Sequence, residues 1–495
     1  MQGRCTVRSA VLRGVEAVPV DVEVAVSKGL PGFYIVGMAD AAVQESRERV
    51  RAALRASGFS MPAERVVVNL APSALKKRGS GFDLAVAVAL LAATRQVNPD
   101  LTQGALFVGE LSLEGRVRPV DGLLAYSLCA RNEGVALVCA DAPERLVSVE
   151  GAEQRGLESL SALRTGSWRP LFPPCFAAVP YVLDFRDVAG NEMAKRALQI
   201  AAAGSHGILM TGPPGSGKTM LASRLPSILP PLEEGEALEV ALVHSVAGCD
   251  IAPALSGIRP FRAPHHSASM AGLVGGGSPL RPGEISLAHR GVLFLDELAE
   301  FKPSVLQSIR QPLEQGSIVI TRADGNLAFP ADFMLVAATN PCPCGYFGDP
   351  ERTCTCTIPQ VNSYRNRIGG PLMDRIDLHI DVQRIPPADV LRAGAAPPSE
   401  ELRRAVVAAR EYALRRRSRE GRSATTGDIV RSCHLAADDR AFFEKTARIN
   451  GMSGRALVRT LSVARTIADM AQRPRVSRDD LCEALGFRLR AGSTS

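Results

Sequence analysis

The sequence predicts an α/β core placed between an α+β unit at the N-terminus and a small helical unit at the C-terminus. Strand and helix patterns alternate over residues 184–385, as they do in an α/β nucleotide-binding domain. Within this stretch, a short apolar run at residues 207–210 is followed by the glycine-rich turn Gly-Pro-Pro-Gly-Ser-Gly-Lys-Thr. Over residues 386–495 apolar side chains recur at helical spacing, as in Leu402, Val406, Ala409 and Ala413.

Residues 1–150 have the pattern of a separate α+β unit. Alternating valines at residues 18–26 predict a strand that is buried on one face. Residues 41–57 predict a helix and residues 84–93 a buried helix, and further strands are expected at residues 65–70, 106–111 and 136–139. Residues 151–183 are predicted to be a linker, because they show weak periodicity and contain Pro170, Pro173, Pro174 and Pro180.

Length and composition narrow the class of protein. A chain of 495 residues with 46% hydrophobic residues suggests about three domains with sizeable cores. The net charge of +7 is compatible with a nucleic-acid partner. Because only 5% of residues are aromatic, an extensive base-stacking surface is not expected, and any DNA contact should be mainly to phosphates.

The sequence gives no sign of export or of membrane insertion. The first residues lack the apolar segment of a signal peptide, and the longest clear apolar run, at residues 84–93, is too short to span a bilayer. We therefore expect a cytoplasmic protein without a membrane partner. Its eleven cysteines should then be mostly reduced.

The glycine-rich turn fits the pattern G-x-x-x-x-G-K-[ST] of a phosphate loop, between a predicted strand and a predicted helix. Its backbone N–H groups can close around phosphate oxygens, and the helix N-terminus adds a positive end. Lys218 can reach the β and γ phosphates, and the Thr219 hydroxyl can ligate Mg²⁺. The predicted ATP-binding residues are Gly212, Pro213, Pro214, Gly215, Ser216, Gly217, Lys218 and Thr219.

A second element supplies two carboxylates. Residues 291–298 read Gly-Val-Leu-Phe-Leu-Asp-Glu-Leu, an apolar strand that ends at Asp296 and Glu297. Asp296 is predicted to hold Mg²⁺ through water, and Glu297 to orient and polarise the attacking water. ATP hydrolysis is therefore the activity that the residues predict most directly.

With these motifs in place, the chain closely resembles the YifB/ComM family of magnesium-chelatase-like AAA+ proteins over nearly its whole length. The most specific marks are Arg-Pro-Phe-Arg-Ala-Pro-His-His at 259–266, Pro-Gly-Glu-Ile-Ser-Leu-Ala-His at 282–289 and Gly-Pro-Leu-Met-Asp-Arg-Ile-Asp-Leu-His at 370–379. The resemblance implies an AAA+ P-loop NTPase core with a helical lid, assembled as a homo-oligomeric ring that is expected to be a hexamer. ComM-type members are associated with DNA branch migration during natural transformation, which implies single-stranded or branched DNA as the partner.

The resemblance also implies three further residues of the ATPase. Asn340 looks like the sensor 1 residue that touches the γ-phosphate or the attacking water. Arg375 looks like the arginine finger that reaches a neighbouring subunit's ATP, and Arg455 looks like the sensor 2 arginine of the lid. A fixed guanidinium would meet the negative charge that builds on the phosphate oxygens. A surface ion pair is the alternative for each arginine, and Arg459 and Arg465 are alternatives to Arg455.

The N-terminal unit is similar to the Lon-protease-like fold (ribosomal S5 domain 2-like) through residues 109–120. The protease chemistry does not carry over, because Gly81 stands where the serine nucleophile would fall and no lysine follows residues 121–123. A pairing of Ser80 with Lys76 or Lys77 is the remaining protease interpretation. A non-catalytic domain for assembly or DNA contact is favoured over it.

Two Cys-x-Cys pairs follow Asn340 directly. Cys342 and Cys344 form the first pair, and Cys354 and Cys356 form the second. Four thiolates on a short polar loop can bind Zn²⁺ tetrahedrally, and we favour this over a loop of reduced, unligated cysteines. A loop held in this way would brace the ATP sensor or shape the pore of a ring.

Other polar clusters have plainer interpretations. His265 and His266 are expected to be solvated or hydrogen-bonded rather than metal-bound. In related AAA+ motors the helix-2 insertion occupies this stretch, so Arg259 and Arg262 are predicted to contact DNA in a central pore. A basic helical face is expected to be a solvated lid surface or subunit contact rather than a DNA site; it consists of Arg410, Arg415, Arg416, Arg417, Arg419 and Arg422.

Three classes of function remain. The first is a hexameric AAA+ ATPase that translocates on DNA, and the second is the ATPase subunit of a metal chelatase that inserts Mg²⁺ or Co²⁺ into a tetrapyrrole. The third is a non-enzymatic scaffold, which the complete set of ATPase residues argues against. The N-terminal unit and the cysteine pairs favour the first class.

Overall fold

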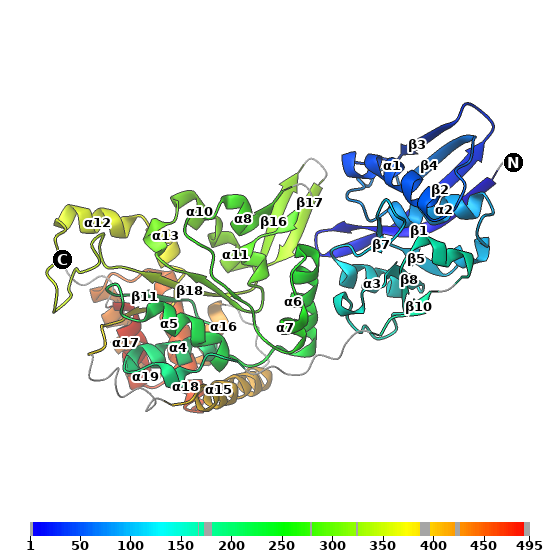
Figure 1. Ribbon diagram of the computed structural model, residues 1–495. Coiled ribbons are helices and arrows are strands. Elements are labelled where there is room, and N and C mark those ends of the chain that lie inside the picture. The colour runs from blue at the N-terminus through cyan, green and yellow to red at the C-terminus, as the bar shows by residue number, and fades with distance from the viewer. Residues whose placement is uncertain are drawn as a thin grey trace.

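The computed structural model describes residues 3–166, 168–172, 181–277, 280–322, 325–386, 397–420 and 426–489. Its strands form two large sheets, one of eight strands in the N-terminal unit and one of five strands in the central part of the chain. Figure 1 shows the N-terminal unit at one end of the molecule and the central sheet with the C-terminal helices at the other.

The N-terminal sheet has the strand order β10-β9-β8-β5-β1-β2-β4-β3. The long strands β1 (Gly3–Arg13) and β2 (Glu16–Ser27) pair in antiparallel register, and β2 buries alternate valines as predicted. The helix α2 (Asp83–Ala93) is buried along its whole length, and α1 (Ala41–Ala56) packs beside it. The other strands are β3 (Gly32–Val36), β4 (Arg65–Ala71), β5 (Ala105–Phe107), β8 (Ala136–Ala140) and the small hairpin of β6 (Glu110–Leu111) and β7 (Val117–Arg118).

This sheet extends into the segment predicted to be a linker. β9 (Gln154–Leu157) pairs in parallel with β8, and β10 (Arg169–Pro170) pairs with β9 in antiparallel register. The strands are too short to give a periodic sequence pattern. They cover the edge of β8, whose backbone N–H and C=O groups would otherwise lack partners. Pro173, Pro174 and Pro180 lie outside the described residues.

The central sheet is parallel and has the order β12-β15-β18-β11-β19. Because parallel strands share one direction, their carboxyl ends meet at a single edge, where α/β proteins bind ligands. The residues of the three inner strands are almost all buried. The strands are β11 (Ile208–Thr211), β12 (Phe261–Arg262), β15 (Val292–Leu295), β18 (Met334–Thr339) and β19 (Leu378–Asp381).

Helices cover both faces of this sheet, as Figure 1 shows. One face packs on α4 (Glu192–Gly204), α5 (Lys218–Arg224) and the C-terminal helices. The other face packs on α8 (Met270–Val274), α9 (Glu284–Leu287), α10 (Pro303–Ser308), α11 (Arg310–Gln315) and the hairpin of β16 (Ser317–Arg322) and β17 (Gly325–Pro330). α12 (Ile358–Asn366) and α13 (Gly370–Met373) precede the edge strand β19.

The C-terminal part is helical, as predicted. It contains α15 (Ser399–Glu420), α16 (Thr426–Ser432), α17 (Ala437–Ile449), α18 (Gly454–Met470) and α19 (Arg478–Leu489). Apolar side chains of these helices, including Val406, Leu461 and Leu485, join those of α4 and β11 in one continuous hydrophobic core. The helical unit is therefore attached to the central α/β unit by burial of apolar surface.

A buried polar joint adds to this attachment. The Asp377 carboxylate accepts hydrogen bonds from the Gly207 backbone N–H at 3.0 Å and from Arg459 Nη1 at 2.6 Å, and it lies 3.5 Å from His206 Nδ1. Burial raises the pKa of Asp377, but the contacts with His206 and Arg459 outweigh burial and lower it to about 2. The carboxylate is thus held in its charged form between β11, β19 and α18.

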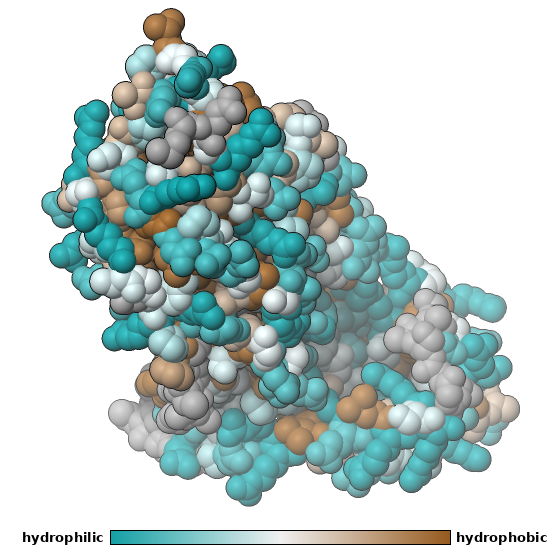
Figure 2. Space-filling view, turned by 90° about the vertical axis from the view of Figure 1, so that its right-hand side faces the viewer, coloured by the Kyte–Doolittle hydropathy of each residue, from teal (hydrophilic) through white to brown (hydrophobic). Residues whose placement is uncertain are grey.

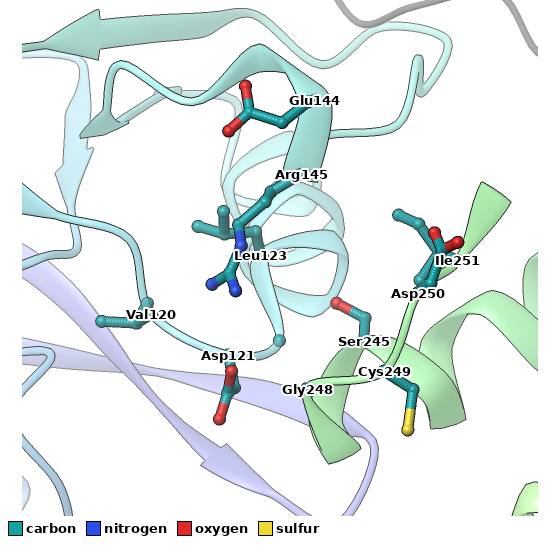
Figure 3. Close-up of a pocket in the computed structure, with 11 residues that line it drawn as sticks. Val120, Asp121, Leu123, Glu144, Arg145, Ser245, Gly248, Cys249, Asp250 and Ile251 are labelled. Carbon is teal, nitrogen blue, oxygen red and sulfur yellow. The ribbon is translucent and has the colours of Figure 1, made fainter.

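The N-terminal unit meets the core through α3 (Leu123–Asn132) and α6 (Glu234–Ala247). The Gly122 N–H donates to the Ser245 carbonyl at 2.8 Å, and Asp121 pairs with Arg281 at 3.0 Å. Figure 3 shows the small pocket beside this contact, about 260 Å³ in volume, in which Asp121 and Arg145 face Ser245 and Cys249. Apolar residues of α6 and α7 (Ala252–Leu255) pack on Leu124 and Val147 next to it.

The surface in Figure 2 is largely hydrophilic, with hydrophobic residues in small, separate patches. Within the described ranges, no helix combines the length and the apolar character needed to cross a bilayer. Among the described residues, an exposed apolar row lies at the sheet edge, on and after β3, at Tyr34, Val36 and Met38.

Candidate nucleotide-hydrolysis site

The glycine-rich turn connects β11, next to the centre of the core sheet, to the start of α5. Gly215 and Gly217 adopt φ angles of +77° and +89°, a region that side chains disfavour. A Cβ at Gly212 would lie 2.2 Å from the Val382 carbonyl oxygen, so this turn also requires glycine for close packing. The sequence pattern and the observed loop agree in position and in shape.

Lys218 is the first residue of α5, and its ammonium group lies against the backbone of this loop. Its Nζ donates to the carbonyl oxygens of Gly212 at 2.7 Å and Pro213 at 2.9 Å. Burial lowers the pKa of Lys218, whereas the charges of Asp296 and Glu297 raise it, and the net shift is downward. Phosphate oxygens would give this ammonium group charged acceptors in place of neutral carbonyls, which makes a stronger hydrogen bond.

The two residues predicted to hold magnesium lie in contact. Thr219 Oγ1, on the first turn of α5 after β11, donates to Asp296 Oδ2 at 2.7 Å, at the carboxyl end of β15. A hydroxyl and a carboxylate are the hard oxygen ligands that Mg²⁺ prefers, together with water and phosphate oxygens. The donor set therefore fits Mg²⁺.

Glu297 follows Asp296 in a left-handed conformation, with a φ of +51°. Its Oε2 atom lies 3.1 Å from Nδ1 of His266, whose ring stacks on that of His265 with centroids 4.1 Å apart. The expectation that the two histidines are solvated or hydrogen-bonded named no partner for them, and the contact with Glu297 was not predicted. Their place in a family-specific motif, in a glycine-rich and serine-rich loop, was the available signal.

We expect His266→Ala to lower the kcat of ATP hydrolysis on the order of tenfold, with little change in the KM for ATP, because misplacement of a reacting group slows chemistry more than it weakens binding. His266→Gln, which keeps a hydrogen-bond donor, should recover part of the rate. His265→Ala is the matched control, since His265 bonds to Ser267 and not to Glu297. Steady-state kinetics measures all three, and equal effects of the two alanine variants would contradict a specific role for His266.

Asn340 follows the last residue of β18 and faces the same site. Its Oδ1 atom lies 3.4 Å from Lys218 Nζ, so the residue predicted as sensor 1 is beside the phosphate loop. Its role toward the γ-phosphate stays a prediction.

The two predicted arginines meet on one carboxylate. Arg375 Nη2 lies 2.8 Å and Arg455 Nη2 lies 3.3 Å from Oε1 of Glu314, at the end of α11. The alternatives to Arg455 have other partners: Arg459 pairs with Asp377, and the buried Arg465 pairs with Asp469 and donates to backbone carbonyls. The structure thus brings Arg375 and Arg455 together in ion pairs with Glu314, the kind of contact named as the alternative for each, so their roles in the ATPase stay predictions.

Comparison with known proteins shows the family of the chain. The family described as magnesium chelatase, subunit ChlI, matches residues 184–390, and two further descriptions of the same subunit match residues 22–142 and 396–488. The competence protein ComM of Haemophilus influenzae is 42% identical over 96% of this chain and 95% of its own length. The protein YifB of Escherichia coli is 41% identical over the same shares.

The chain belongs to the YifB/ComM family of magnesium-chelatase-like AAA+ proteins. Membership in this family implies ATPase activity with ATP and Mg²⁺. The similarity to chelatase subunits themselves is more restricted: the magnesium-chelatase 67 kDa subunit of Chlorobaculum parvum is 29% identical over 32% of this chain and 24% of its own length.

The prediction that Arg259 and Arg262 contact DNA does not agree with the structure of this YifB/ComM family member. Arg259 is buried and donates to Glu236 at 2.8 Å and to the carbonyls of Pro230 and Arg290. Arg262 forms a two-pronged ion pair with Glu284 at 2.6 and 2.7 Å. Both guanidinium groups bind the loop to adjacent segments of the same chain. The two positive charges of the motif therefore have structural partners.

The basic face of the lid is also partly structural. Arg410 donates to the Ala202 carbonyl and to Ser205, and burial lowers its pKa to about 10. Arg416 is buried against Asp469 at 2.9 Å. Arg422 lies outside the described residues. These contacts agree with the expectation that this face is not primarily a DNA site.

The pairing of Ser80 with Lys77 is wrong. The Ser80 hydroxyl donates to Glu110, and the buried Lys77 ammonium group donates to the Pro72 carbonyl, so the two are not paired. A Cβ at Gly81 would lie 3.8 Å from the Tyr126 hydroxyl, whose pKa is raised because the group is buried. The place where the nucleophile would stand therefore lies in ordinary contact with Tyr126, Val108 and Val120.

The four clustered cysteines converge in space. Their sulfur atoms all lie within 4.8 Å of one another, although the two pairs come from opposite ends of a loop. The loop lies between β18 and α12 and contains no helix or strand, so its shape depends on side-chain contacts.

Proposed function

We propose that the chain is an ATP-hydrolysing ring motor, built as a hexamer, that moves on single-stranded or branched DNA. In this proposal it drives branch migration of incoming DNA during natural transformation, in the cytoplasm where ATP and DNA are available. The observation that carries the proposal is the near full-length similarity to the protein named competence protein ComM, combined with a complete site for ATP hydrolysis.

The proposed chemistry assigns one task to each group. The phosphate loop and Lys218 bind the phosphates. Thr219 and Asp296 would hold Mg²⁺, which would supply positive charge to the phosphates when bound. Glu297 accepts the proton of the attacking water, and Asn340 orients that water or the γ-phosphate. Water attack then breaks the bond between the β–γ bridging oxygen and the γ-phosphorus, giving ADP and phosphate.

The arginine pair supports a ring. Arg375 and Arg455 share Glu314 on α11, and both are engaged away from the contacts of their own Lys218. In the proposal Arg375 acts on the ATP of the adjacent subunit, where it supplies the positive charge that the transition state needs, and Arg455 is the sensor 2 arginine of the lid. Such a finger only has a function in an oligomer.

The N-terminal unit is proposed to be a non-catalytic, Lon-like domain. Its sheet is continuous and well buried, and it is joined to the core through α3 and α6. The loop between β1 and β2 also approaches the β16–β17 hairpin, since a Cβ at Gly14 would lie 3.2 Å from the Ala328 carbonyl oxygen. In the proposal, this domain supports assembly or guides DNA toward the β16–β17 hairpin.

DNA binding should be mainly electrostatic, because the chain is basic and poor in aromatic residues. The logarithm of affinity should fall linearly with the logarithm of salt concentration, with a slope of about −0.7 per contacted phosphate for single strands. Fluorescence anisotropy with labelled single-stranded and branched DNA, with ATP present, measures it. Arg262→Ala serves as a control that should leave the slope unchanged, since Arg262 is paired with Glu284.

This binding assay, together with ATPase rates measured with and without DNA, tests the alternative, the ATPase subunit of a metal chelatase, which the family description for residues 184–390 names. A DNA motor should hydrolyse ATP faster when DNA is added. Absence of binding to any DNA with ATP present, or an affinity independent of salt, would contradict the motor and favour the chelatase.

A further inference from the structure

The sulfur atoms of the four cysteines have the spacing of a metal site. Cys342 Sγ lies 3.4 Å from Cys344 Sγ and 3.7 Å from Cys354 Sγ, and the last two are 3.5 Å apart. Four thiolates around Zn²⁺ at about 2.3 Å place neighbouring sulfurs about 3.8 Å apart. The three sulfur–sulfur distances are therefore close to those expected around a zinc ion. The four cysteines form no disulfide bond.

Backbone groups are arranged to support these thiolates. The Cys344 N–H points at Cys356 Sγ and the Cys356 N–H points at Cys354 Sγ, each at 3.4 Å. Hydrogen bonds to ligating atoms orient a metal's ligands and stabilise their charge. Cys342 is fully buried, which fits a closed structural site better than an exposed, reactive one.

The cysteine loop packs on the phosphate loop. Gly345 has a φ of +87°, and a Cβ at this position would lie 2.6 Å from Pro214 Cδ, so its backbone sits directly against Pro214. Only glycine allows this approach.

Arg384 makes a second connection between the two loops. Its Nη2 donates to the Pro214 carbonyl at 3.5 Å, its Nε lies 3.5 Å from Asp349 Oδ2, and its guanidinium lies over the Tyr346 ring at 5.3 Å. Tyr346 and Asp349 belong to the stretch between the two cysteine pairs. Pro214 is thus held from two sides by groups whose position depends on the cysteine loop.

We propose that the four cysteines bind one zinc ion and that the zinc-held loop fixes the phosphate loop at Pro214 in the shape that binds ATP. The loop has no helix, strand or apolar core of its own, so the metal supplies the free energy that orders it. The second half of this inference rests on the proposed ATP-binding role of residues 212–219, whereas the zinc site stands on the cysteines alone.

Metal analysis of the purified full-length chain tests the first half. We expect about one zinc ion per chain, falling at least tenfold in Cys354→Ser. Cys482→Ser is the matched control, because Cys482 is exposed on α19 and apart from the cluster, and it should keep its zinc. A wild-type chain without bound zinc after expression in zinc-supplemented medium would overturn the proposal.

Two glycine variants test the contact without touching a ligand. Gly345→Ala should keep its zinc and weaken binding of a fluorescent ATP analogue on the order of tenfold. Gly348→Ala is the control, because Gly348 has a similar φ of +78° but nothing within 4 Å of its Cβ position, and it should keep both zinc and ATP affinity. Equal affinity of the two variants, or a zinc-free Cys354→Ser chain that binds ATP normally, would overturn the bracing role.

Failure of the ATP site itself is recognised separately. If Lys218→Ala binds the nucleotide as well as the wild type, the proposed phosphate loop is wrong while the zinc content stays unaffected. Circular dichroism of Cys354→Ser shows whether the rest of the chain has kept its fold, and Gly345→Ala gives a result that does not depend on that variant.

Discussion

Glu297→Gln is expected to bind ATP with unchanged affinity and to lose nearly all hydrolysis. An amide matches the carboxylate in shape but cannot accept the proton of the attacking water, and such proton transfer contributes about 10²–10⁴-fold to rate. The residue lies beside Asp296 at the carboxyl end of β15, close to the Mg²⁺ ligands and to Lys218. Phosphate release in the steady state, together with nucleotide binding at equilibrium, measures both parts of the prediction.

Lys218→Ala provides the contrast. It removes the ammonium group that neutralises the phosphates, so binding itself should be lost. The glutamine variant should instead accumulate as an ATP-bound assembled ring, visible by size-exclusion chromatography with ATP. Normal turnover by Glu297→Gln would show that another group activates the water.

Arg375→Ala is expected to reduce turnover about 10³-fold or more while ATP still binds, as loss of an arginine finger does. The guanidinium would act where charge develops on the transferred phosphoryl group, and no other group replaces it. Its removal also leaves Glu314 with Arg455 alone, so Glu314→Gln is a useful control for disturbance of α11. That control should keep most of the activity.

Mixed rings test whether this arginine works across a subunit boundary. Subunits carrying Arg375→Ala and subunits carrying Lys218→Ala are each inactive, but a mixture places some intact fingers opposite intact phosphate loops. Partial activity of the mixture supports action in trans. Mixtures no more active than either variant alone would argue against it.

Much of the site is readable from sequence because it is local. Residues 212–219 lie in one turn, and Asp296 and Glu297 end one strand, so spacing along the chain alone indicates their chemistry. The helix α2 was likewise indicated by a continuous apolar run, and α15 by apolar residues at helical spacing. Asn340 required only the end of an apolar run and the resemblance to a family.

What sequence did not reveal depends on contacts between distant segments. His266 on Glu297 and Gly345 on Pro214 join parts of the chain that no spacing rule connects. The prediction for Arg259 was wrong because the residue type alone does not show whether a loop arginine faces solvent or is buried, and Arg259 is buried against Glu236. β9 and β10 were missed since strands of two to four residues leave too little pattern to detect.

The joint at Asp377 has a consequence for how force is transmitted. The lid shares one hydrophobic core with α4 and β11, and the buried carboxylate fastens α18 to the sheet at the same place. Bending at this joint would expose apolar surface and leave the Asp377 carboxylate without its Arg459 partner, which costs on the order of several kcal/mol. In the proposed ring, each subunit should therefore turn as a single rigid unit. Motion after ATP hydrolysis would then be a change of angle between neighbouring subunits.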